Sequence, residues 1–256
     1  MSPSVRLAVE DRVATITVDR PDRLNALNRS ALVELEEAIE KAAADGVRVL
    51  VLTGAGDDSF VAGADIAAMQ DLTTAEADEY ARLGHGVVDA IREFPGPAIA
   101  AINGYAFGGG AELALACDLR VASERAVIGQ TEIDLGIIPG WGGTQRLPAL
   151  VGDEMARRLI YFGDRVDASD AHEIGLVGEV IAHDDLDDHV ADLAAELAEK
   201  PGFALATAKE ALNARYETTL SAGLDFERRA WAGLFGSHDQ REGMAAFLGD
   251  REPDFE

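Results

Sequence analysis

The alternation of short apolar runs with longer stretches of helical periodicity constrains the fold of this chain more than any other feature. The apolar runs have the length of β-strands and cover residues 12–18, 47–53 and 98–102. The helical stretches that separate or follow them cover 30–44, with Ser30 as the expected cap, 75–94 and 111–117. Because apolar strands alternate with helices, we expect an α/β domain whose sheets are largely buried.

The chain becomes mostly helical after Pro148. Its length of 256 residues allows one large domain or a core with a small appendage. Pro201 and Gly202 interrupt the helical pattern, and we therefore divide the chain into a core at 1–199 and a helical subdomain at 200–256. The apolar faces in the second part exceed what a short helical hairpin can bury, so we expect them to cover a core or a neighbouring subunit. The helices expected after Pro148 cover 153–162, 168–174, 186–199, 203–215, 220–235 and 239–248.

The charge balance excludes several classes of partner. Asp and Glu number 47 against 22 Lys and Arg, which gives a formal net charge of −25. This charge argues against binding to nucleic acid or to an anionic membrane surface. A surface rich in carboxylates stays solvated where salt screens its self-repulsion, so we expect a halophilic source.

Location and redox chemistry follow from what the sequence lacks. Its apolar runs are too short to span a bilayer, and residues 1–7 have no apolar signal core. We therefore expect a cytoplasmic protein. The single cysteine, Cys117, allows no internal disulfide and no cysteine-based zinc cage. It lies in an apolar run and is interpreted as a small buried side chain.

Three consecutive glycines at 108–110 precede a helix that is apolar except for Glu112. Glycine lets the backbone approach a ligand closely, and free N–H groups at a helix start attract negative charge. These are the components of an oxyanion hole, and Glu112 would stand beside it. The alternative is that Glu112 only complements the helix dipole.

A second acid, Glu132, lies beside another glycine-rich segment. Thr131 is a candidate N-cap with Asp134 at the capping-box position, so Glu132 also fits ordinary helix-start chemistry. Two carboxylates with separated pKa values can, however, supply one base and one acid. The small residues at 62–64 would allow a backbone N–H to point at a carbonyl, although an ordinary connection explains them equally well.

Other familiar signatures are missing. The sequence has no Walker motif and no nucleophile elbow, and the glycines at 104–110 do not have dinucleotide-binding spacing. The five histidines show no helix-face pair joined to a third ligand. We therefore expect neither a metal site nor a separate cofactor.

Six segments together resemble the crotonase (enoyl-CoA hydratase/isomerase) superfamily. Among them are Ala62-Gly-Ala-Asp65, Gly129-Gln-Thr-Glu-Ile133 and the segment from 101 to 113 that contains the three glycines. The others are 13–27, 136–147 and 242–247, so the resemblance extends over nearly the whole chain. It implies a spiral core of repeated ββα units and a C-terminal helical subdomain that packs subunits into homotrimers or homohexamers.

The resemblance also implies a site and a reaction. The amides of Ala62 and Gly109 would hold the thioester oxygen of an acyl-CoA substrate, and Glu112 and Glu132 would add water to a 2-enoyl-CoA. We assign water activation mainly to Glu112 and proton delivery to Glu132. Residues expected to contact the substrate or its CoA part are Arg23, Leu24, Ala26, Ala64, Asp65, Ile66, Gly140, Trp141, Phe247 and Arg251.

Related activities on the same scaffold remain open at this point, namely 3-hydroxyacyl-CoA dehydration, enoyl-CoA isomerisation and thioester hydrolysis. The presence of both glutamates favours hydration, and the negative charge disfavours an RNA-associated binding protein. Lysines frequent after position 247 in the family are absent, which leaves Arg23 and Arg251 as candidates for attracting CoA phosphates. Met69, Leu83, Ile138 and Trp141 belong either to the acyl pocket or to the core.

Overall fold

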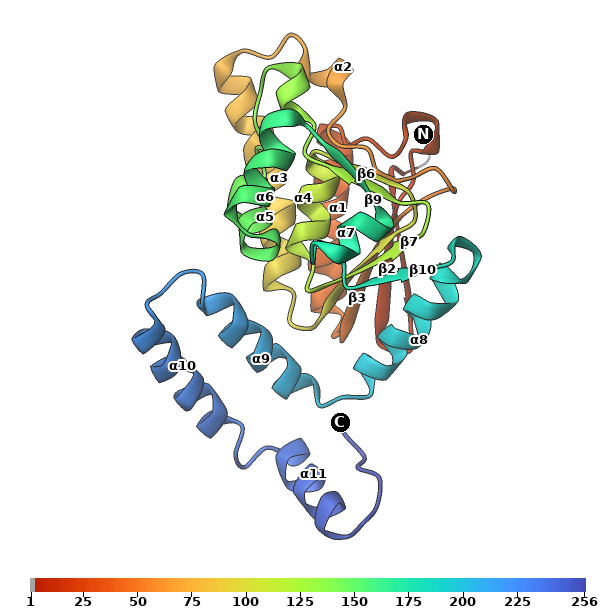
Figure 1. The fold of residues 1–256 in the computed structure, drawn as a ribbon. Helices are drawn as coiled ribbons and strands as arrows, with labels where there is room; N and C mark the ends of the chain where they lie inside the picture. The colour runs from red at the N-terminus through yellow and green to blue at the C-terminus, as the bar shows by residue number, and fades with distance from the viewer. Residues whose placement is uncertain (1–2) are drawn as a thin grey trace.

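A six-stranded sheet forms the centre of the fold in the computed structural model, which describes residues 3–256 (Figure 1). The first two residues, part of the stretch in which no signal sequence is expected, lie outside the described residues. In the sheet only β1 and β2 pair antiparallel, and the other neighbours are parallel. The strand order is β1 (Val5–Glu10), β2 (Val13–Val18), β3 (Val49–Gly54), β5 (Ala98–Ile102), β7 (Leu119–Ser123) and β10 (Glu179–Ile181).

A smaller four-stranded sheet lies beside the first. Its order is β4 (Ser59–Val61), β6 (Tyr105–Phe107), β8 (Val127–Gly129) and β9 (Arg165–Asp167). Along the chain β3 is followed by β4, β5 by β6, and β7 by β8, with helical segments after each pair. The chain therefore repeats strand, strand and helix, which confirms the expected fold of stacked ββα units.

Helices cover both faces of the large sheet. The core helices are α1 (Arg29–Ala44), α2 (Ile66–Met69), α3 (Thr74–Glu93), α4 (Gly109–Ala116), α5 (Gly143–Val151), α6 (Asp153–Phe162), α7 (Ala168–Glu173) and α8 (Leu186–Ala198). Short 3₁₀ turns occur at η1 (Pro21–Arg23), η2 (Glu132–Leu135) and η3 (His183–Asp185). On one face Leu35 and Ile39 of α1 are fully buried, and on the other Val190 of α8 packs on Val51 and Ile99. Parallel strands buried in this way explain the continuous apolar runs of the sequence.

One local prediction is wrong, and two elements were not predicted. Helix α1 is capped by Asn28, whose side chain accepts a 2.9 Å hydrogen bond from Ala31, and not by Ser30, whose hydroxyl bonds Glu34 instead. Strand β1 was not expected; it pairs with β2 through a tight turn in which Asp11 has a φ of 44°. Helix α5 was also missed, because glycines precede it and Pro148 lies inside it.

Three C-terminal helices extend away from the core in Figure 1. They are α9 (Gly202–Ala214), α10 (Leu220–Gly233) and α11 (His238–Leu248). Several of their large apolar side chains are exposed, among them Trp231 at 62% and Phe247 at 85%. The expected apolar faces are therefore present, while the domain boundary at residue 200 stays a prediction. None of the helices within residues 3–256 is both long enough and apolar enough to cross a membrane.

Candidate active site

A pocket of about 520 Å³ opens where the carboxyl ends of three neighbouring strands meet. Strands β4, β6 and β8 lie side by side in the small sheet and run parallel. The segments that directly follow them, around 62–64, 108–109 and 131–132, all line the pocket. Helix α3 and the segment around Trp141 complete its wall. Of the residues expected in the site, eight line the pocket: Ala62, Ala64, Ile66, Gly109, Glu112, Glu132, Gly140 and Trp141.

Glu112 is held in place by the backbone. Its side chain is buried, and Oε1 accepts hydrogen bonds of 2.7 Å from the N–H groups of Trp141 and Gly143. Burial raises the pKa of Glu112, and the hydrogen bonds from Gly143 and Trp141 oppose that rise. One oxygen of the carboxylate is therefore fixed by two backbone donors.

Glu132 lines the same pocket, but its carboxylate is not held by hydrogen bonds from described residues as that of Glu112 is. It is 8% exposed, and neither carboxylate oxygen has a hydrogen-bond partner among residues 3–256. Burial raises its pKa to about 7, and the nearby charge of Glu112 acts in the same direction. A Cβ on Gly108 would lie 3.2 Å from its Oε1, and Gly108 has a φ of +50°, so glycine is favoured there by both space and conformation.

The expected capping box beside Glu132 is not formed. Thr131 does occupy the N-cap position of the short turn η2, but its side chain makes no capping hydrogen bond. The segment is a single 3₁₀ turn, which is too short for the reciprocal bonds of a capping box. Helix-start chemistry therefore does not account for the buried Glu132 carboxylate.

The structure corrects the prediction for Ala62. The N–H of Ala62 donates a 3.0 Å hydrogen bond to the carbonyl of Leu24, so it is not free to bind a ligand. Two residues later, Ala64 forms a parallel bridge with Leu27, in which the N–H of Leu27 donates to the carbonyl of Gly63 and the N–H of Asp65 donates to the carbonyl of Leu27. In such a bridge the N–H of Ala64 itself points away from Leu27. Ala64 lines the pocket, so its amide is the free donor of this loop.

Gly109 supplies a second amide beside the pocket. It is the first residue of α4, where an N–H has no acceptor within the helix. The loop of Gly63 passes close to it, since a Cβ on Gly63 would lie 3.8 Å from the Gly109 nitrogen. The amides of Ala64 and Gly109 therefore belong to adjoining segments at one side of the pocket. The sequence alone does not show which N–H at 62–64 is free, because the N–H groups of successive residues in an extended segment point in alternating directions.

The residues around Arg23 lie outside the pocket wall but are tied to it. Leu24 accepts the hydrogen bond of Ala62, and Arg20 links two loops by donating to the carbonyl of Ala26 and pairing with Asp65 at 3.2 Å. Arg20 was missed in the sequence, where it is part of a turn signal. Arg23 ends the turn η1 and is exposed.

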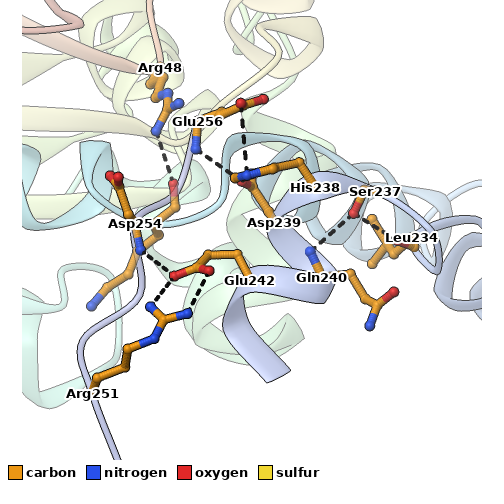
Figure 2. A network of polar contacts seen from close by, with 11 residues as sticks. Arg48, Leu234, Ser237, His238, Asp239, Gln240, Glu242, Arg251, Asp254 and Glu256 are labelled. Atoms are coloured by element: carbon orange, nitrogen blue, oxygen red, sulfur yellow. Dashed lines mark hydrogen bonds and ion pairs between the residues drawn. The ribbon is translucent and has the colours of Figure 1, made fainter. Parts of the chain in front are cut away.

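Phe247 and Arg251 are not brought to the pocket within one chain. Both lie at the α11 end of the molecule, opposite α2 in Figure 1. Figure 2 shows Arg251 paired with Glu242, with Nη2 and Oε2 2.8 Å apart, and the backbone of Asp254 donating to the same carboxylate. These bonds lower the pKa of Glu242 to about 2, so the charge of Arg251 is balanced within its own chain.

Met69, Ile138 and Trp141, which were proposed for either the pocket or the core, line the pocket, and Met69 and Trp141 also pack in the hydrophobic core. Leu83 packs against the core and does not line the pocket. Tyr80 also lines the pocket, with its ring centroid 6.2 Å from that of Trp141, and was not predicted. Cys117 is buried as expected, and burial raises its pKa to about 12, which keeps the thiol protonated.

A second hollow, of about 610 Å³, lies on the other side of the large sheet beside α8. It is lined by threonines of β2, by Asn103 and by His183. The amide of Asn103 is already bonded to the carbonyls of Gly54 and Gly56. The unsatisfied buried carboxylate of Glu132 therefore marks the smaller pocket as the chemical site.

Comparison with known proteins agrees with the geometry. Residues 8–256 match the family model described as Enoyl-CoA hydratase/isomerase. The chain is 43% identical to a crotonyl-CoA hydratase of Syntrophomonas wolfei, covering 98% of this chain and 97% of the relative. It is 40% identical to a short-chain-enoyl-CoA hydratase of Clostridium acetobutylicum, covering 97% and 96%. The crystal structure of an enoyl-CoA hydratase from Bacillus anthracis superimposes with a TM-score of 0.94 at 37% identity, covering 98% of each chain.

Proposed function

This chain belongs to the enoyl-CoA hydratase/isomerase family, and from that premise we propose how its pocket performs the reaction of an enoyl-CoA hydratase. The reaction is the reversible addition of water to the double bond of a 2-enoyl-CoA thioester, which gives a 3-hydroxyacyl-CoA. One observation carries the proposal: two buried glutamates line the pocket beside Ala64 and Gly109, whose N–H groups have no acceptor among residues 3–256.

The amides of Ala64 and Gly109 bind the thioester oxygen. Their hydrogen bonds polarise the carbonyl, so that C3 becomes electrophilic and negative charge gathers on the oxygen. An oxyanion donor of this kind contributes roughly 3 to 4 kcal/mol to transition-state stability. Ala64 replaces Ala62 in this role, because the amide of Ala62 is bonded to Leu24.

The two acids divide the proton transfers. Glu112 is held by two N–H donors that favour its carboxylate, which suits it to take a proton from the attacking water. Glu132 has no such donors and a pKa of about 7, so it retains a proton near neutral pH. The hydroxyl adds to C3 and Glu132 delivers its proton to C2. Glu112 then releases the proton taken from water to solvent and Glu132 takes one up, which restores both groups. These transfers need no metal and no redox cofactor.

Exposed apolar side chains support assembly into homotrimers or homohexamers through α9, α10 and α11. Leu220, Phe247 and Leu248 are at least 80% exposed in the single chain, and their burial between copies would be favourable. Such packing would also offer a neighbour the C-terminal residues that do not reach their own pocket. Sedimentation equilibrium should give a mass of three or six chains, and a single-chain mass would contradict the assembly. A cytoplasmic location stays a prediction from the N-terminal sequence.

Turnover of crotonyl-CoA tests the function directly. The ultraviolet absorbance of the conjugated thioester should fall as water adds, while release of free CoA thiol would indicate a hydrolase instead. We expect Glu112→Gln and Glu132→Gln each to lower kcat by at least about 10²-fold, the usual scale for general acid–base groups. Glu124→Gln, at an exposed position nearby in the chain, is the matched control and should keep full activity. Full activity of Glu132→Gln would contradict the assignment.

A further inference from the structure

The indole ring of Trp141 is wedged between two glycines on different helices. A Cβ on Gly84 of α3 would overlap Nε1 and Cε2 of the ring, and a Cβ on Gly109 of α4 would overlap Cζ3. Neither glycine has a positive φ, so space and not backbone conformation requires glycine at both positions. The ring is 4% exposed and therefore sets the separation of α3 from the first residue of α4.

The backbone of the same residue holds Glu112. The N–H of Trp141 donates to Oε1 of Glu112, and the carbonyl of Trp141 accepts a 2.9 Å hydrogen bond from Arg146. A Cβ on Gly142, which has a φ of +110°, would overlap the Arg146 guanidinium. The peptide groups on both sides of Trp141 are therefore fixed, and a displaced ring would carry them along.

We propose that Trp141 is a positioning residue for hydration, and that Gly84 is the residue that gives its ring room. Through its ring Trp141 fixes the amide of Gly109, and through its N–H it fixes the carboxylate of Glu112. An oxyanion donor and a base act together only when both are placed to within a fraction of an ångström. The inference rests on the proposed function, because it assigns those two groups to one reaction.

Substitution of Gly84 tests the positioning role separately from any direct contact between Trp141 and the substrate. Trp141 itself lines the pocket, so its truncation would also change the space available to the acyl chain. Gly84 lies behind the ring and does not line the pocket. Gly84→Ala reaches the reacting groups only by moving the ring, and in a Trp141→Ala background no ring is left to move.

The test is a double-mutant cycle of Gly84→Ala and Trp141→Ala, with kcat, KM and the pH dependence of kcat measured for crotonyl-CoA. We expect Trp141→Ala to lower kcat by about 10²-fold and Gly84→Ala by about tenfold, the scale of a misplaced catalytic group. In the Trp141→Ala background, Gly84→Ala should cost almost nothing more. The acid limb of the kcat profile should move to higher pH in Trp141→Ala, since misaligned donors lower the pKa of Glu112 less. Compared with Trp141→Ala, Trp141→Phe should have a higher kcat and an acid limb closer to that of the wild type.

Gly86→Ala is the matched control on the same helix, because the atoms nearest to its Cβ would be the carboxylate end of the flexible Glu36 side chain and not Trp141. It should leave kcat unchanged. The positioning role would be overturned if the losses in kcat multiplied in the double variant. A change in KM alone, with the acid limb of the kcat profile unmoved, would also overturn it. If Gly84→Ala fails to fold by circular dichroism, the acid limbs of Trp141→Phe and Trp141→Ala decide the matter. Wild-type hydration in the same assay tests the proposed function separately, so the two failures are distinguishable.

Discussion

Glu132 is buried and its carboxylate has no hydrogen-bond donor among residues 3–256, so the carboxylate is costly to ionise. Its pKa rises from 4.5 to about 7 on folding. The folded state thus binds this proton more tightly than the unfolded state does. The stability associated with protonated Glu132 is fully present below about pH 4.5 and is lost as the pH rises towards 7. Above pH 7 the ionised side chain destabilises the fold by on the order of 3 kcal/mol.

Glu132→Gln should accordingly be more stable than the wild type at pH 8 and about equally stable at pH 4.5. Gln has the shape of the protonated acid but cannot ionise. Urea unfolding at the two pH values measures the difference in free energy of unfolding. Equal stabilities at pH 8 would mean that water or another group solvates the Glu132 carboxylate in the folded protein.

Arg23 is the residue near the pocket that we propose to attract the CoA phosphates. It is exposed, it takes part in none of the ion pairs among residues 3–256, and its neighbour Leu24 is bonded to the pocket wall at Ala62. We expect Arg23→Gln to raise the KM for crotonyl-CoA severalfold without lowering kcat, with a larger effect at low salt. Arg12→Gln, in the turn between β1 and β2, removes the same charge and should leave KM unchanged. An unchanged KM in Arg23→Gln would exclude a role in CoA binding.

At the scale of elements, one buried lysine holds helix α9 on the core. Lys209 is 7% exposed and donates 3.0 Å hydrogen bonds to the carbonyls of Ile91 and Gly96. It also pairs with Asp118 at 2.8 Å, and Asp118 in turn accepts from the N–H of Ala98 at the start of β5. The anchor therefore joins α9 to the end of α3 and to the start of β5, a central strand of the large sheet.

Lys209→Met should detach α9 while leaving the core folded. Removing one partner of a buried pair costs about 3 kcal/mol, because the other groups lose their compensation. Hydrogen exchange should then accelerate along α9 more than in the strands of the large sheet. Lys200→Met removes an exposed lysine, just beyond the end of α8, that pairs with the exposed Glu196, and it should change little. Uniform acceleration of exchange across the chain would show that α9 is not a separate element.

At the scale of the whole molecule, the net charge of −25 dominates. Most of the ion pairs lie at the surface and contribute little each, so self-repulsion among carboxylates is not balanced locally. We expect the free energy of unfolding to rise between dilute buffer and molar KCl, as salt screens this repulsion. Replacing exposed acids, such as Asp188 and Asp192 of α8 and Glu199 directly after it, by lysine should weaken the salt dependence. Greatest stability in dilute buffer would contradict a halophilic adaptation.

The overall architecture also builds the site. Ala64, Gly109 and Glu132 are far apart in the sequence, but each follows a strand of the small sheet in one of three successive ββα turns. Parallel strands place their carboxyl ends at one edge of the sheet, where the loops converge. The spiral thereby collects two amides and two acids around one pocket.

The sequence by itself determined which residue types stand where chemistry can occur. Apolar runs indicated the buried strands, three glycines marked a close backbone approach, and Glu112 and Glu132 stood out beside glycine-rich loops, because each of these signals is local. Only the tertiary structure decided that Ala64 and not Ala62 has the free amide, since that depends on the bridge to Leu27. It also decided that Trp141 fits between Gly84 and Gly109 and that the two acids differ in their hydrogen bonds. Hydrogen-bond direction, burial and pKa arise from contacts between distant segments, and these exist only once the chain has folded.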